Sequence, residues 1–182
     1  MKRLLAVLVL IVSASGFCMA QNNPYVTCTY TLSKNPDSLY KGDFVKLFIE
    51  VKPNPNMRVY SAQPSPKKTY TPAELTFDIE SRGVIALEGL KEEGILFTEY
   101  DDIAGGTQRY YKKPVKFIQQ LRITEDNWKI RADFDYMAGD GDVLEVYTLK
   151  VNINPSVERP TEEIPDDKPE DGTTDDGNTD GE

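Results

Sequence analysis

The sequence predicts an all-β protein with the architecture of an immunoglobulin-like antiparallel β-sandwich. Apolar and polar residues alternate with a period of two along several short segments, which is the pattern of half-buried strands. Turn residues separate these segments at intervals of roughly 8–15 residues, a spacing that favours a sandwich over a barrel. No segment keeps a helical period for long enough to predict an α-helix.

The first three expected strands lie between residues 26 and 61. In residues 26–32 (VTCTYTL) apolar side chains alternate with threonines. Residues 44–51 (FVKLFIEV) form the next expected strand, which ends before Pro53 because proline cannot donate a hydrogen bond to a ladder. A short strand at 57–61 (MRVYS) precedes a loop rich in proline.

The later strands are shorter at first and then long. The segments ELTFDI (74–79), VIAL (84–87) and 95–97 are brief apolar runs between turn residues. Three longer strands are expected at 114–123 (PVKFIQQLRI), 129–137 (KIRADFDYM) and 143–153 (VLEVYTLKVNI). Trp128 opens the second of these and is expected to pack in the core or at a sheet edge.

Residues 1–20 have the features of a signal peptide. Lys2 and Arg3 precede an apolar run at 4–12, and small residues end in an Ala20 suited to cleavage. The run is too short to span a bilayer comfortably. Cys18 raises the alternative of a lipoprotein, but Phe17 stands where a lipobox requires a small residue, so simple cleavage is favoured. We expect the mature protein to be periplasmic or secreted, with no later membrane span.

The mature chain divides into a domain at 21–155 and an acidic tail at 156–182. Residues 160–182 hold ten acidic side chains and one lysine, a net charge of 1 − 10 = −9, which equals that of the whole chain. The charges of residues 1–159 therefore sum to zero, and the acidity of the chain belongs to the tail. The tail has too few apolar residues to offset its ordering entropy, so it is expected to be disordered. A solubilising role is favoured over calcium binding, and nucleic acid is not an expected partner.

The composition excludes several kinds of chemistry. The chain has no histidine, which removes histidine-based acid–base catalysis and most zinc and copper sites. After cleavage Cys28 is the single cysteine, so no internal disulfide is expected. Cys28 lies on the apolar face of its strand and is expected to be a small core residue. We expect no cofactor and no bound metal, and we expect a monomer.

The stretch DYMAGDGDVLEVY (135–147) contains a turn that allows two interpretations. Asp140, Asp142 and Glu145 suggest a calcium loop, which would need several converging oxygen ligands. However, strand pattern resumes at Val143, which leaves little chain to wrap a cation. Asp140-Gly141 is also an ordinary signal for a two-residue hairpin turn, and this interpretation is favoured.

The order of several segments resembles a known family. These segments are MRVYS, TPAELTFDI, TEYDDIAGGTQRYYKKPVKFIQQLRI and IRADFDYMAGD. Together they resemble the N-terminal periplasmic domain of the thiol:disulfide interchange protein DsbD, also called the disulfide bond corrector domain. The resemblance covers residues 24–153 and implies an immunoglobulin-like sandwich that relays electrons through two cysteines flanking a hairpin.

The resemblance also implies positions for the redox cysteines. The first would fall at Gly139 and the second near Leu144, so neither is a cysteine in this chain. Thiol exchange needs an attacking thiolate and a second thiol that resolves the mixed disulfide. The relay chemistry is therefore expected to be absent, and no catalytic residue is assigned.

In the family a mobile aromatic and acidic cap closes over the cysteines. Residues 97–111 (FTEYDDIAGGTQRYY) resemble this cap, with Gly105 and Gly106 giving it backbone freedom. A contact surface could include residues of the cap and of the neighbouring strand: Tyr100, Asp101, Tyr110, Tyr111 and Tyr136. These tyrosines suit peptide contacts or burial in the sandwich, and burial is favoured.

Three functions are compatible with the sequence. The leading hypothesis is an exported, non-catalytic module that binds an envelope protein or peptide through a sheet edge or the cap side. The second is residual enzymatic activity, either thiol:disulfide interchange through Cys28 or catalysis by carboxylates. The candidate carboxylates are Asp101, Asp102, Asp135, Asp140 and Asp142. The third is a structural component of the cell envelope whose tail acts as a spacer.

Overall fold

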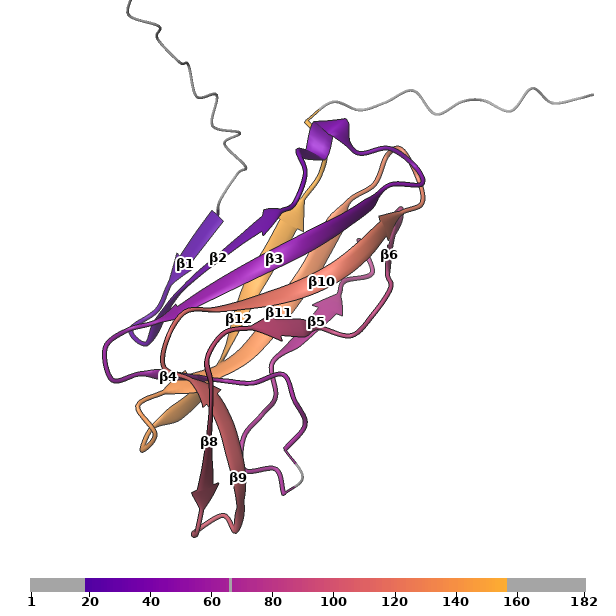
Figure 1. Ribbon diagram of the computed structural model, residues 1–182. Coiled ribbons are helices and arrows are strands. Elements are labelled where there is room, and N and C mark those ends of the chain that lie inside the picture. The colour runs from indigo at the N-terminus through magenta and orange to yellow at the C-terminus, as the bar shows by residue number, and fades with distance from the viewer. Residues whose placement is uncertain (1–18, 66, 157–182) are drawn as a thin grey trace, which may run out of the picture.

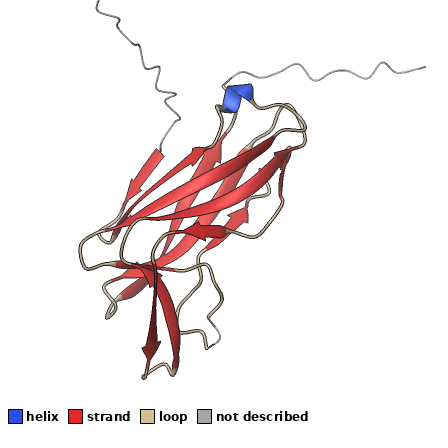
Figure 2. Cartoon of the chain, viewed as in Figure 1, coloured by secondary structure: helices blue, strands red, loops and turns tan. Residues whose placement is uncertain are grey.

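A computed structural model describes residues 19–65 and 67–156 of the chain. Most of the predicted signal peptide and of the predicted acidic tail lie outside the described residues. In the described part, two antiparallel sheets pack face to face, and the single helical element is one 3₁₀ turn (Figures 1 and 2). The predicted all-β, immunoglobulin-like sandwich is confirmed. Within these residues no helix has the length and apolarity that a membrane crossing needs.

Each sheet contains six strands. The first sheet has the order β1-β2-β3-β10-β6, with β7 also paired to β10. Its strands are β1 (Met19–Asn22), β2 (Val26–Leu32), β3 (Phe44–Pro53), β6 (Val84–Ala86), β7 (Lys91–Glu93) and β10 (Val115–Ile123). The second sheet has the order β12-β11-β4-β9-β8, with β5 also paired to β11. Its strands are β4 (Arg58–Tyr60), β5 (Glu74–Phe77), β8 (Leu96–Asp101), β9 (Gly106–Tyr111), β11 (Ile130–Gly139) and β12 (Leu144–Ile153). The 3₁₀ turn η1 (Pro36–Ser38) lies between β2 and β3.

Three strands, β1, β7 and β9, are absent from those that the sequence predicts. The charged β7 (KEE) and the glycine-led β9 (GTQRYY) lack the apolar period of a strand. Both are defined by their neighbours, since β7 pairs with β10 and β9 lies between β4 and β8. Strand β5 ends at Phe77 and not at Ile79, because the Asp78 carboxylate accepts the Glu80 N–H and starts a turn.

Strand β1 lies across the predicted cleavage point after Ala20. Its backbone pairs with β2, with Gln21 opposite Cys28 and Asn22 opposite Thr27. Cleavage after Ala20 would leave these last two pairs of the four in the ladder.

The main core lies between the sheets and is built by strand alternation. On β3 every second side chain, from Val45 to Val51, is buried. On β11 the same holds from Ile130 to Ala138. Aromatic rings occupy the centre, with ring centroids 5.0 Å apart for Phe117 and Phe134. Burying one such side chain contributes about 1.5–3 kcal/mol to stability, so this core accounts for the strand arrangement.

A second, smaller cluster lies where the β8–β9 hairpin projects beyond the body of the sandwich (Figure 1). Its buried members are Tyr60, Tyr70 and Tyr110. Phe97, Met137 and Leu144 pack against them and are partly buried. This cluster attaches the projecting hairpin to the end of the second sheet.

Glu92 links the two sheets through a pair of hydrogen bonds. It lies on β7 of the first sheet, and its carboxylate accepts the Ser61 hydroxyl at 2.8 Å and the Ala62 N–H at 2.6 Å. Ser61 follows directly after β4 of the second sheet and is fully buried. A carboxylate acceptor makes these hydrogen bonds stronger than neutral ones.

We expect Glu92→Gln to lower the free energy of unfolding by about 1–3 kcal/mol. The neutral amide loses the charge assistance of the carboxylate, and only one of its two terminal groups can accept a hydrogen bond. Urea denaturation would measure the change. Glu93→Gln on the same strand is the matched control, since the Glu93 side chain is exposed, and should change stability by less than about 0.5 kcal/mol. Equal effects in the two variants would contradict the bridging role.

Candidate functional site

The candidate site is the hairpin between β11 and β12. Gly139 and Leu144 are directly opposite each other in the ladder, so the two positions that the resemblance assigns to the redox cysteines do face one another. The hairpin prediction is confirmed, but the loop has four residues, Asp140–Val143, and not two. The reason is the Asp140 side chain, whose Oδ1 accepts the N–H groups of Asp142 and Val143, both at 2.9 Å.

The Asp140 carboxylate is held within the turn by hydrogen bonds. The backbone N–H groups of Val143 and Asp142 that bind Asp140 lower the pKa of this carboxyl below its usual range. Gly141 follows with a φ of 109°, which favours glycine. Across the described residues, no three acidic or cysteine side chains lie close enough together to hold a metal ion.

Position 139 has no room for a side chain. A Cβ added to Gly139 would lie 1.9 Å from the Val143 carbonyl oxygen and 3.1 Å from the Leu144 Cα. Both contacts are with backbone, so no rotation of a flexible side chain relieves them. A cysteine at this position therefore requires a different path of the hairpin loop.

The side chain at position 144 packs against neighbouring residues. The Leu144 side chain is partly buried against the tyrosine cluster of Tyr60, Tyr70 and Tyr110. Arg58, opposite Gly139 in the ladder, lies with its guanidinium 4.5 Å from the centre of the Tyr110 ring. Apolar and aromatic groups thus occupy the space beside the hairpin.

A polar network closes this space. The Tyr110 hydroxyl donates to Glu99 Oε2 at 2.7 Å, and the same oxygen lies 3.5 Å from Arg58 Nη1. Burial, and then the Glu99 carboxylate, raise the pKa of Tyr110. The buried Tyr60 hydroxyl donates to Gln108 Oε1 at 3.0 Å. Sequence reasoning missed Glu99 and Gln108, because only the pairing of β8 with β9 brings them to the hairpin.

The tyrosines named from the sequence do not share one surface. Burial is confirmed for Tyr110, Tyr111 and Tyr136, whereas Tyr100 is 60% exposed. Tyr110 and Tyr111 are neighbours on β9 and point to opposite faces, so Tyr110 enters the small cluster and Tyr111 enters the main core with Tyr136. The four tyrosines of the suggested contact surface therefore do not lie on one face of the molecule.

Residues 97–111 form an ordered hairpin of β8 and β9. Asp101 fixes its tip, since Oδ1 accepts the N–H groups of Ile103 and Ala104 and Oδ2 accepts Gln108 Nε2 at 2.7 Å. Gly105 has a φ of 65°, as its expected backbone freedom allows. Gly106 serves close packing instead, because a Cβ there would lie 2.6 Å from Thr69 Cγ2.

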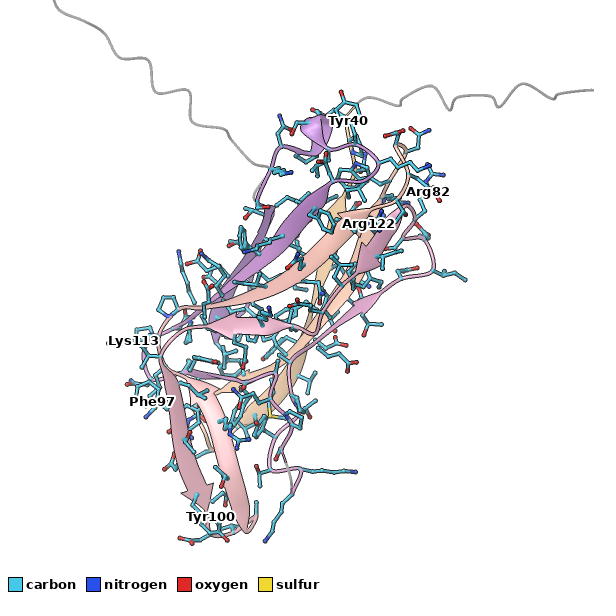
Figure 3. The ribbon with its side chains drawn as sticks, turned by 45° about the vertical axis from the view of Figure 1, so that its right-hand side comes forward. Tyr40, Arg82, Phe97, Tyr100, Lys113 and Arg122 are labelled. Atoms are coloured by element: carbon cyan, nitrogen blue, oxygen red, sulfur yellow. The ribbon has the colours of Figure 1, made fainter. Side chains whose placement is uncertain are left out.

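A pocket of about 310 Å³ lies between the tip of this hairpin and the β11–β12 loop. Its walls include Arg58, Glu99, Asp102, Ile103 and Gly141. Tyr100 also lines it and lies at the far tip of the molecule in Figure 3. We call this region the cap end; it brings together Tyr100 and Asp101 of the predicted contact surface.

Comparisons with known proteins identify a similar fold but do not assign the chain to a family. No family model matches the sequence, and no curated protein matches it. The structure is similar to the N-terminal periplasmic domain of ScsB from Proteus mirabilis, a DsbD-like protein, with a TM-score of 0.53 at 14% identity. The match covers 76% of this chain and 50% of that one, so the chain spans about half of that structure.

Two further structures are less similar. The GAE domain of yeast GGA1 matches with a TM-score of 0.37 at 9% identity, over 73% of this chain and 95% of that one. A DUF4426 family protein from Pseudomonas aeruginosa matches with a TM-score of 0.28 at 14% identity, over 76% and 99%. What the chain shares with ScsB is a DsbD-like fold.

Cys28 belongs to the sheet opposite the hairpin. It is fully buried on β2 in the first sheet, as predicted, whereas positions 139 and 144 belong to the second sheet. Desolvation by burial raises the pKa of the Cys28 thiol to about 12. Only a thiolate attacks a disulfide, so Cys28 is poorly placed and poorly ionised for exchange.

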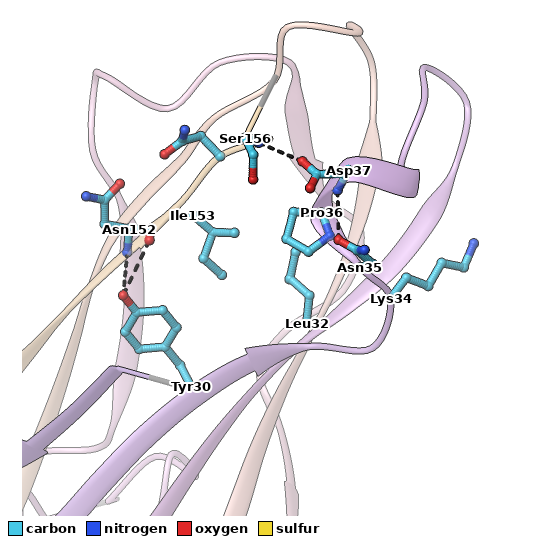
Figure 4. Close-up of a pocket in the computed structure, with 10 residues that line it drawn as sticks. Tyr30, Leu32, Lys34, Asn35, Pro36, Asp37, Asn152, Ile153 and Ser156 are labelled. Atoms are coloured by element: carbon cyan, nitrogen blue, oxygen red, sulfur yellow. Dashed lines mark hydrogen bonds between the residues drawn. The ribbon is translucent and has the colours of Figure 1, made fainter. Parts of the chain in front are cut away.

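Another pocket, of about 320 Å³, lies between η1 and the end of β12 (Figure 4). Polar groups in its wall bind one another. The Tyr30 hydroxyl contacts both the carbonyl and the N–H of Asn152, and Asp37 Oδ1 accepts the Ser156 N–H at 2.6 Å. These groups hold the last described residues of the chain against β2 and η1.

Proposed function

We propose that the protein is an exported, non-catalytic protein-binding module that retains a DsbD-like scaffold without thiol:disulfide exchange. The observation that carries this proposal is the hairpin at Gly139 and Leu144. One position has no space for a Cβ and the other is packed into the tyrosine cluster. Export to the periplasm or beyond is supported by the signal-like N-terminus and by the fold shared with a periplasmic domain.

The binding surface in this proposal is the cap end. Ile103 is 101% exposed and Tyr100 is 60% exposed at its tip, and exposed apolar groups rimmed by polar ones mark interaction sites. The acidic residues that line the cap-end pocket beside them are Glu99, Asp101 and Asp102; Arg58 pairs with Glu99, and Lys67 Nζ lies near Gly105 at the same tip. A partner segment with lysine or arginine beside an aliphatic or aromatic side chain complements this surface.

A photo-crosslinking residue at position 103 tests the proposal in cells that export the protein. We expect a discrete crosslinked partner from position 103 and none from position 79, because Ile79 is equally exposed at 99% but lies beyond β5, away from the cap end. The crosslink at 103 should weaken in Asp102→Asn, which removes an acidic charge of the pocket wall and keeps the hydrogen bonds of Asp101 and Glu99 within the hairpin. Crosslinking at both positions alike, or at neither, would contradict specific binding at the cap end.

A further inference from the structure

A basic pocket lies at the other end of the molecule from the cap. Its volume is about 280 Å³, and it lies where β11 begins and the chain leaves β12. Figure 3 places Arg82 near this end and Tyr100 at the opposite tip. The pocket is lined by Arg82, Asn127, Trp128, Lys129, Arg131 and Asn154.

The cations of this pocket outnumber the acid that contacts them. Glu80 Oε2 lies 3.0 Å from Lys129 Nζ and 3.9 Å from Arg131 Nε, so one carboxylate pairs with two cations. Arg82 is a third cation in the pocket wall. Arg82 and Lys129 are also directly opposite each other, since each backbone N–H donates to the other's carbonyl. Like charges directly opposite in a ladder are destabilising, so this pair leaves a local excess of positive charge.

Two residues of the pocket wall have buried N–H donors without a hydrogen-bond partner in the described part of the chain. Trp128 is 1% exposed, and its Nε1 has no hydrogen-bond partner among the residues that the structure describes. Arg131 Nε also has no hydrogen-bond partner among these residues, and its ion-pair partner Glu80 Oε2 lies 3.9 Å away. Buried polar groups in folded proteins are nearly always hydrogen-bonded, and an exception calls for an explanation, of which a bound water or ion is one.

We propose that this pocket binds a negatively charged ligand, either a carboxylate or another small oxyanion such as phosphate. Such a ligand supplies the acceptors that the wall lacks and neutralises the opposed pair of Arg82 and Lys129. Guanidinium groups bind planar carboxylates with two parallel hydrogen bonds, which suits Arg82 and Arg131. The site is independent of the cap end and of the function proposed for it.

The carboxylate has two available sources, which share this chemistry. One is a free anion from solution. The other is the acidic stretch that follows Pro155, itself part of the pocket wall; its nearest acids are Glu158, Glu162, Glu163, Asp166 and Asp167.

Trp128 makes the test direct, because it is the single tryptophan of the chain. Its fluorescence and its indole N–H resonance report on this pocket alone. The full chain is titrated with succinate and with inorganic phosphate at constant ionic strength. We expect a saturable shift of both signals, with the affinity reduced at least tenfold in Arg82→Gln/Lys129→Gln. The control Lys46→Gln/Lys116→Gln removes the same charge from β3 and β10 and should bind like the wild type.

A second full-length variant separates the two sources. It carries amides in place of the five nearest acids. If the chain's own carboxylates fill the pocket, the indole resonance of this variant differs from the wild type before any anion is added, and only this variant responds to succinate. The proposal is overturned if neither protein responds, or if the charge variants and their control respond equally.

Discussion

Replacing Gly139 with alanine is expected to lower the free energy of unfolding by about 3 kcal/mol, the upper part of the usual range for overpacking. The added Cβ would lie 1.9 Å from the Val143 carbonyl oxygen, well inside contact distance. Relief requires moving the backbone of a loop that Asp140 already holds through two hydrogen bonds. Thermal unfolding should show a fall in Tm of roughly 10 °C, and urea denaturation would give the free energy.

Gly89→Ala is the matched control for this experiment. A Cβ at Gly89 has no neighbouring atom within 4 Å, so the change should stay within about 0.5 kcal/mol. If Gly139→Ala proves as stable as Gly89→Ala, the hairpin accepts a side chain at position 139. A cysteine could then occupy this position without a new loop path, and the structural argument for the proposed absence of exchange would fail.

The strands that could be predicted are those whose burial pattern is local. In the sequences of β3 and β11, apolar and polar side chains alternate, and the alternating apolar side chains form much of the main core. The same alternation predicts that Cys28 is a core residue, and it is buried; Trp128, expected in the core or at a sheet edge, is buried as well. The hairpin at Gly139 was also predictable, since its turn residues lie between two long alternating runs.

The features that could not be predicted depend on pairings distant in sequence. The order of β9 between β4 and β8 brings Glu99 to Arg58 and separates Tyr110 from Tyr111. Nothing in the residues near β7 shows that Glu92 reaches Ser61. The length of the hairpin loop was misjudged because the Asp140 side chain, and not the backbone alone, closes it. The surfaces that we propose as binding sites at both ends of the molecule arise from such long-range contacts.

Cys28 is expected to react with a thiol reagent at least about 1,000 times more slowly in the folded protein than in the unfolded chain at pH 8. Burial raises the pKa of the thiol from 9.0 to about 12. Below pH 9 the thiolate fraction is proportional to 10 to the power of pH minus pKa, so a difference of three lowers it about 1,000-fold. The ratio should hold as the pH falls, because both rates drop tenfold per pH unit. Labelling with 5,5′-dithiobis(2-nitrobenzoate), with and without denaturant, would measure it.

A cysteine placed on the other face of the same strand is the control. Thr29→Cys in a Cys28→Ala background puts a thiol on the more exposed side of β2, where it should react within an order of magnitude of the unfolded chain. Rapid labelling of native Cys28 would show that the thiol reaches solvent as a thiolate, and residual interchange through Cys28 would again have to be considered. Slow labelling leaves the described domain without a thiol able to attack a disulfide, because the two positions facing each other across the hairpin carry glycine and leucine. A scaffold of this kind can still bind a partner at its cap end, since that contact depends on exposed side chains and not on sulfur.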